Sequence, residues 1–148
     1  MIVDASVWVA MFRESDVHHG ASVAFLDLAV ANQQDLNIPN LALAEIAGVL
    51  ARQTGKARLA TRTIRAVLAL PRVQRHGLND ALGDRAAALA ASCKLRGADA
   101  VFVALAEALD QPLITLDREI LERSSRVIEV EAPDVWVYRQ AGSPVGTI

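Results

Sequence analysis

The chain has 148 residues, a length that suits one domain with a single hydrophobic core. Its 53% apolar content excludes a disordered chain, and its formal net charge of −2 gives no overall basic field that would attract nucleic acid. One cysteine, Cys93, excludes an internal disulfide and a cysteine-based zinc site, and the pattern around it favours a buried thiol. With no secretion signal and no uncharged stretch of about 18 apolar residues, we expect a cytoplasmic protein without a membrane span.

Hydrophobic periodicity and turn residues divide the chain into short strands and longer helices. The expected strands cover residues 1–3, 36–38, 72–76, 113–116 and 127–130. The expected helices cover residues 6–12, 17–31, 40–54, 57–70, 79–95, 99–109 and 118–123, with Ser6 and Asn40 as N-caps, Gly55 ending the third and Asn79 starting the fifth. This alternation predicts an α/β domain whose central, mainly parallel sheet is flanked by helices. We expect one domain over residues 1–139, followed by a flexible C-terminal tail over residues 140–148.

Four acidic residues stand next to or within apolar elements. Asp4 and Asp117 each end a predicted strand, whereas Glu45 and Asp99 each interrupt an apolar helix. A carboxylate in such a place loses hydration on folding, a cost that a hydrogen bond, a counter-charge or a metal ion offsets. Because functional groups gather at the carboxyl ends of parallel strands, the four acids predict a shared pocket that binds a divalent cation.

Each acid also has a purely structural explanation. Asp4 could cap the first helix, Glu45 could lie on a solvated helix face, Asp99 could be an N-cap, and Asp117 could begin a turn. None of the four is persuasive alone, but together they favour a site. The three histidines add nothing to it: His18 and His19 are adjacent and point in different directions on a helix, and His76 has no evident partner.

The segments around these acids resemble a known family. They are residues 2–6 (IVDAS), 43–50 (LAEIAGVL), 96–106 (RGADAVFVALA) and 113–119 (LITLDRE). In this order and spacing they resemble the PIN-domain nucleases, most closely the VapC-type toxins of bacterial and archaeal toxin–antitoxin pairs. The resemblance covers nearly the whole chain and implies a single PIN domain.

The resemblance implies a metal-dependent ribonuclease. Its catalytic and metal-binding residues would be Asp4, Glu45, Asp99 and Asp117. Ser6 and Thr115 would support them, although a helix cap and a strand-end hydroxyl explain these two equally well, and Glu119 is an outer candidate. Oxygen-only ligands suit Mg²⁺ or Mn²⁺, which would activate a water for attack on an RNA phosphodiester and leave a 5′-phosphate and a 3′-hydroxyl.

Partners follow from the same resemblance and from a basic segment. Residues 46–79 contain no acid, and a basic ridge within them would contact RNA phosphates, with a solvated helix face as the alternative. The ridge consists of Arg52, Lys56, Arg58, Arg62 and Arg65. The resemblance further implies a small antitoxin protein as partner, and surplus apolar side chains over residues 41–70 suggest a homodimer.

Other functions remain open at this point. The chain could be a PIN-fold nuclease outside a toxin–antitoxin system, acting in RNA processing, or a non-catalytic signalling or binding domain with an acidic pocket. A phosphoacceptor domain would need a second acid beside Asp4 and a lysine after a late strand, but Lys94 lies in a predicted helix. A haloacid-type phosphatase would need an acid where this chain has Ser6.

Overall fold

A computed structural model describes residues 1–142 of the protein. This part of the chain contains a five-stranded sheet in the order β3-β2-β1-β4-β5, in which every neighbouring pair is parallel. The strands are β1 (Ile2–Val3), β2 (Leu36–Pro39), β3 (Val73–His76), β4 (Leu113–Ile114) and β5 (Val130–Glu131). The predicted α/β fold with a central parallel sheet is confirmed.

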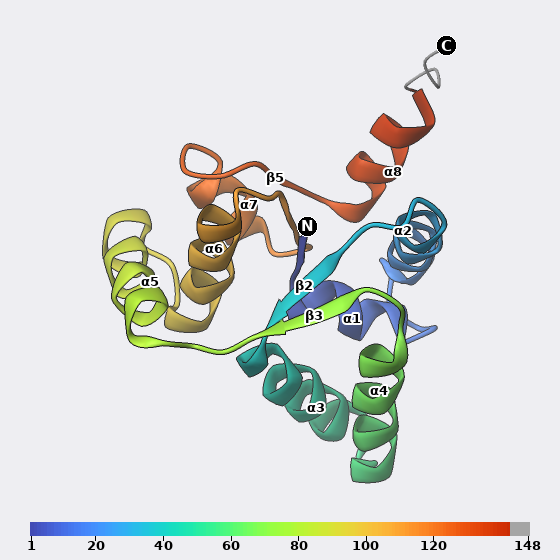
Figure 1. The fold of residues 1–148 in the computed structure, drawn as a ribbon. Coiled ribbons are helices and arrows are strands. Elements are labelled where there is room, and N and C mark those ends of the chain that lie inside the picture. The colour runs from blue at the N-terminus through green and yellow to red at the C-terminus, as the bar shows by residue number, and fades with distance from the viewer. Residues whose placement is uncertain (143–148) are drawn as a thin grey trace.

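Helices surround the sheet and give the molecule its outline. They are α1 (Ala5–Met11), α2 (His19–Ala31), α3 (Asn40–Thr54), α4 (Ala57–Ala69), α5 (Asp80–Cys93), α6 (Gly97–Leu109), α7 (Arg118–Ser124) and α8 (Pro133–Gly142). Figure 1 shows α3 and α4 as a pair that extends away from the sheet, while α5 and α6 lie together on another side. None of the helices within residues 1–142 combines the length and the apolar character that crossing a membrane requires.

The strand order creates a topological switch point between β1 and β4. From the central β1 the chain moves outward to β2 and β3, then returns past β1 to build β4 and β5 on the other side. Val3 pairs with Ile114 in register, and the Asp4 amide donates to the Ile114 carbonyl at 3.0 Å. The chain therefore leaves β1 and β4 side by side, at the place where α/β proteins bind ligands.

The central strands are short and are buried on both faces. The side chains of Ile2, Val3, Leu36, Leu113 and Ile114 are fully buried. Such strands read as continuous apolar runs without alternation, which is why three residues sufficed to predict β1. The edge strand β3 is only half-buried, and its sequence is correspondingly polar.

Side-chain hydrogen bonds shift some predicted boundaries. β4 ends two residues early because the Thr115 hydroxyl accepts from the Asp117 amide at 3.0 Å and turns the chain away. The expected caps at Ser6 and Asn40 are wrong, since Asp4 and Pro39 hold these positions. The predicted end of α3 at Gly55 is confirmed, and the helix expected to start at Asn79 starts one residue later, at Asp80. Asn79 caps α5 by accepting from the Leu82 amide at 2.9 Å, and α3 ends at Gly55, whose φ of +67° favours glycine.

The final helix, α8, is absent from the sequence prediction. It begins with Pro133, a favourable first helical residue, and buries Trp136 against α2. The Trp136 ring meets Phe25 edge to face, with ring centroids 5.1 Å apart at 79°. Residues 140–142 of the expected tail belong to this helix, whereas residues 143–148 lie outside the described residues.

Candidate active site

The four predicted acids line one pocket. Asp4 follows β1, Glu45 lies on the second turn of α3, Asp99 is the third residue of α6, and Asp117 precedes α7. All four contribute to a cavity of about 340 Å³ at the switch point. Four elements that are far apart in sequence thus bring their carboxylates to one place.

Asp4 forms the floor of this pocket and is held there by two hydroxyls. By position Asp4 is the N-cap of α1, as its structural explanation expected, but its side chain makes no capping hydrogen bond. Instead, its Oδ2 accepts from Ser6 Oγ at 2.5 Å and from Thr115 Oγ1 at 2.8 Å. Ser6 Oγ also accepts from the Leu116 amide at 3.1 Å. Burial raises the pKa of Asp4, and the hydrogen bonds from the two hydroxyls act in the opposite direction.

The pKa of Glu45 shows the effect of the neighbouring carboxylates most clearly. Glu45 is half-buried and faces the cavity, which rules out the solvated-face explanation. Burial, followed by the negative charges of Asp4 and Asp99, raises the pKa of Glu45 to about 7, while Arg96 acts to lower it. Near neutral pH this carboxyl therefore carries a proton in a large fraction of molecules.

Asp99 and Asp117 form the side of the pocket nearest α6 and α7. Asp99 is not an N-cap, because α6 starts at Gly97 and Arg96 holds the cap position. Burial is the main cause that raises the pKa of Asp99, and Arg96 opposes it. Asp117 does cap a helix, since its Oδ1 accepts from the Glu119 and Ile120 amides at 2.7 and 3.3 Å. Asp117 therefore has both roles: it caps α7 and it lines the pocket.

Arg96 is a site residue that sequence reasoning missed. Its Nε lies 3.3 Å from Asp99 Oδ2, and its Nη2 lies 3.5 Å from Asp117 Oδ2. One signal for it was available: Arg96 precedes Asp99 by three residues, the spacing at which helical side chains meet. The outer wall of the pocket adds four polar side chains that were also missed, Arg13, Asp16, His18 and Gln53.

The donor set fits a hard divalent cation. The four carboxylates offer oxygen ligands only, the type that Mg²⁺ and Mn²⁺ prefer. Asp99 Oδ2 is buried without a hydrogen-bond partner in residues 1–142, so the charge of Arg96, 3.3 Å away, offsets its burial while its capacity to accept a hydrogen bond is unused. Within the same residues, no three His, Cys, Asp or Glu side chains are already grouped to hold an ion. Binding would thus require the carboxylates to rotate toward a common point.

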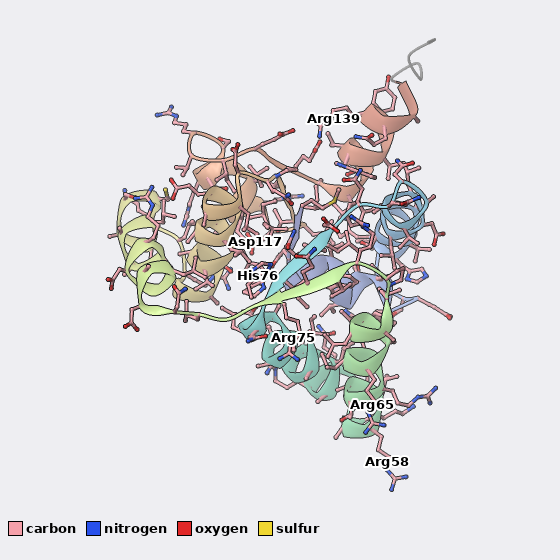
Figure 2. All side chains as sticks on the ribbon, in the orientation of Figure 1. Arg58, Arg65, Arg75, His76, Asp117 and Arg139 are labelled. Carbon is pink, nitrogen blue, oxygen red and sulfur yellow. The ribbon has the colours of Figure 1, made fainter. Side chains whose placement is uncertain are left out.

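The five residues of the basic ridge lie elsewhere. Arg52, Lys56, Arg58, Arg62 and Arg65 are all exposed, and none of them lines the acidic pocket. Figure 2 shows Arg58 and Arg65 pointing outward from the α4 end of the α3–α4 pair, away from Asp117. Three of the five line a separate hollow, formed by residues 55–59 and Arg62.

Two remaining side chains differ from expectation. His76 does have a partner, because its Nε2 lies 2.7 Å from Asn37 Oδ1 on the neighbouring strand. Cys93 is half-buried at the end of α5 and not fully buried as the Ala-rich helix suggested. Neither residue is among those that line the acidic pocket.

The fold and the pocket define an α/β domain with an acidic site at the switch point of a parallel sheet. The PIN domain family matches residues 1–126, and the chain therefore belongs to the PIN domain family. No curated protein matches the sequence significantly.

Three solved structures share the fold at low sequence identity. The toxin VapC20 of Mycobacterium tuberculosis, described as cleaving the sarcin–ricin loop, has a TM-score of 0.69 and 20% identity over 86% of this chain and 95% of its own. VapBC2 of Rickettsia felis, bound to a promoter DNA fragment, has a TM-score of 0.69 and 14% identity; the match covers 88% of this chain and 96% of that chain. FitAcB of Neisseria gonorrhoeae has a TM-score of 0.68 and 17% identity; the match covers 89% of this chain and 96% of that chain.

Proposed function

We propose that this PIN domain is a divalent-cation-dependent endoribonuclease that hydrolyses RNA phosphodiester bonds. One observation carries the proposal: four carboxylates from four separate elements line a single pocket at the switch point. A binding or signalling domain would not need four acids there, at the electrostatic cost that the raised pKa values of Asp4, Glu45 and Asp99 reveal. The description of VapC20 as a toxin that cleaves the sarcin–ricin loop favours RNA as the substrate class.

In this proposal Asp4, Glu45, Asp99 and Asp117 hold Mg²⁺ or Mn²⁺. A bound ion of this kind activates a water and stabilises the charge that develops on a phosphate. Ser6 and Thr115 act through Asp4: their hydroxyls fix the orientation of its carboxylate before the cation arrives. Glu45 would have to lose its proton to serve as a ligand, because its raised pKa leaves it partly protonated near neutral pH.

The test combines two neutral variants with a matched control. Asp4→Asn and Asp99→Asn keep the size of the side chain but remove a charged ligand, and we expect both to abolish cleavage of a labelled RNA in Mg²⁺. Asp84→Asn removes an exposed acid of α5 and should leave cleavage unchanged. Circular dichroism checks that each variant is folded. Wild-type rates in folded Asp4→Asn and Asp99→Asn proteins would refute the proposal.

RNA binding by the basic ridge is a separate part of the proposal. Its five residues are exposed, and none of them makes a salt bridge within residues 1–142. Each phosphate contact of single-stranded RNA contributes about 0.7 to the slope of log K against log salt. Arg58→Ala and Arg62→Ala should each lower this slope by about that amount, while Arg126→Ala, an exposed control beyond the ridge, should not. An unchanged slope in both variants would favour the solvated-face explanation.

We also propose that the protein is the toxin of a toxin–antitoxin pair in the cytoplasm and forms a homodimer. The similarity in fold to VapBC2 and FitAcB supports the first part. The apolar side chains of α3 and α4, including Leu68 with 37% of its area exposed, support the second. A small DNA-binding protein encoded by the neighbouring reading frame should bind the chain and inhibit cleavage. Light scattering should give twice the monomer mass, and a monomer at micromolar concentration would contradict the dimer.

A further inference from the structure

Arg96 spans two of the four pocket carboxylates from within the same chain. It occupies the N-cap position of α6, with an extended backbone (φ −66°, ψ 152°) and no capping hydrogen bond from its side chain. From there its guanidinium lies 3.3 Å from Asp99 Oδ2 and 3.5 Å from Asp117 Oδ2. Two adjacent positive N–H groups therefore face one oxygen of each acid.

These contacts are weak enough to be exchanged. The Arg96 side chain is 71% exposed, and exposed ion pairs typically contribute less than about 1 kcal/mol. The contact with Asp99 is close enough for charge attraction but lacks hydrogen-bond alignment, since Asp99 Oδ2 has no hydrogen-bond partner in residues 1–142. The contact with Asp117 lies at the long end of the hydrogen-bond range. Charge, and not tight geometry, holds the guanidinium in place.

The two acids are more buried than Arg96, and hydrogen bonds also hold Asp117 in place. Asp117 is fixed through its Oδ1 by the Glu119 and Ile120 amides, so only its Oδ2 remains to face a cation. Asp99 has a side chain that is only 17% exposed and is carried by the first turn of α6. A cation that binds these two carboxylates therefore competes with the guanidinium for Asp99 Oδ2 and Asp117 Oδ2.

We propose that Arg96 is a built-in, displaceable counter-ion, which pairs with Asp99 and Asp117 until a divalent cation takes them over and then binds a phosphate of the RNA. The inference rests on the proposed function. A guanidinium suits both partners, because its planar N–H groups match carboxylate and phosphate oxygens alike. Its high exposure at the rim of the pocket leaves it free to turn from one to the other.

The first test measures Mn²⁺ binding to the intact protein by titration calorimetry. Arg96→Gln removes the charge but keeps a long polar side chain, and we expect it to bind Mn²⁺ about three- to tenfold more tightly than wild type, as the loss of one or two exposed ion pairs implies. Arg123→Gln is the matched control, because the salt bridge of Arg123 is with Glu119, at 3.2 Å, whereas those of Arg96 are with Asp99 and Asp117. Its Mn²⁺ affinity should stay at the wild-type value.

The second test measures the salt dependence of binding to a short labelled RNA, with Ca²⁺ in place of Mg²⁺ to slow hydrolysis. Arg96→Gln should lower the slope by about 0.7 when Ca²⁺ is present and leave it unchanged in chelator, where the wild-type guanidinium is occupied by the acids. Equal Mn²⁺ affinity in wild type and Arg96→Gln, or a slope that is the same in Ca²⁺, would overturn the inference. If the wild type binds no Mn²⁺ at all, the proposed function itself fails.

Discussion

Replacing Glu45 by Gln should stabilise the cation-free protein above neutral pH. In the folded state the pKa of Glu45 is raised from 4.5 to about 7, chiefly by burial and then by the charges of Asp4 and Asp99. Between these two values the folded protein holds a proton that the unfolded chain releases. The free energy of unfolding of the wild type therefore falls as the pH rises from about 4.5 through 7, and Gln, which cannot ionise, removes this loss.

The size of the effect follows from the pKa and from the exposure of the side chain. A raised pKa corresponds to about 1.4 kcal/mol for each tenfold change in proton affinity, which gives an upper bound of roughly 3 kcal/mol here. Glu45 is only half-buried, so solvent screening reduces this figure, and we expect about 1 kcal/mol. The carboxylate pocket thus lowers the stability of the domain by a measurable amount when no cation is bound.

Urea denaturation in chelator at pH 5 and pH 8 measures this difference. The two proteins should have similar unfolding free energies at pH 5, and Glu45→Gln should be more stable by about 1 kcal/mol at pH 8. Adding Mg²⁺ at pH 8 should narrow the gap, because only the wild type keeps all four carboxylates for the cation. If wild type and Glu45→Gln show the same pH dependence in chelator, the electrostatic account of the pocket is wrong.

Three further predictions concern the site and the core. Mn²⁺ affinity of the wild type should rise between pH 6 and 8 by up to about tenfold per pH unit and then level off, as Glu45 loses its proton; calorimetry showing a flat profile would contradict this. Thr115→Val should cost about 1–3 kcal/mol in urea denaturation, because it removes the buried hydrogen bond to Asp4 and leaves the partly buried Asp117 amide without its acceptor; a change below about 0.5 kcal/mol would disprove it. Trp136→Ala should cost about 3–5 kcal/mol and increase hydrogen exchange in α8, whereas unaltered exchange would show that Trp136 does not hold this helix.

The sequence was most informative where an acidic residue stands next to or within an apolar strand or helix. Asp4 and Asp117 could be placed at strand ends because apolar runs stop at them, and parallel strands bring their carboxyl ends to one edge. Glu45 and Asp99 stood out as charges within apolar helices. All four reach one pocket in the structure, so the convergence was predictable from local pattern and topology together.

The remaining features depended on contacts that periodicity does not encode. Arg96 is a charged residue before a glycine, and apart from its spacing of three residues from Asp99 the sequence does not distinguish it from a solvated arginine, because its second partner, Asp117, lies far along the chain. The helix α8 was missed because it buries only two of its residues, Pro133 and Trp136, and the main contact of Trp136 is with Phe25, more than 100 positions earlier. Thr115 ended its strand early through a hydroxyl bond that β-propensity cannot show.

RNA cleavage in the presence and absence of divalent cations tests the central claim most directly. A labelled single-stranded RNA is incubated with the wild-type protein in Mg²⁺, in Mn²⁺ and in excess chelator, and the products are separated by length. We predict cleavage with either cation, ending in 5′-phosphate and 3′-hydroxyl groups, and none in chelator. Cleavage at the same rate in excess chelator would contradict the assignment of Asp4, Glu45, Asp99 and Asp117 as the ligands of a catalytic cation.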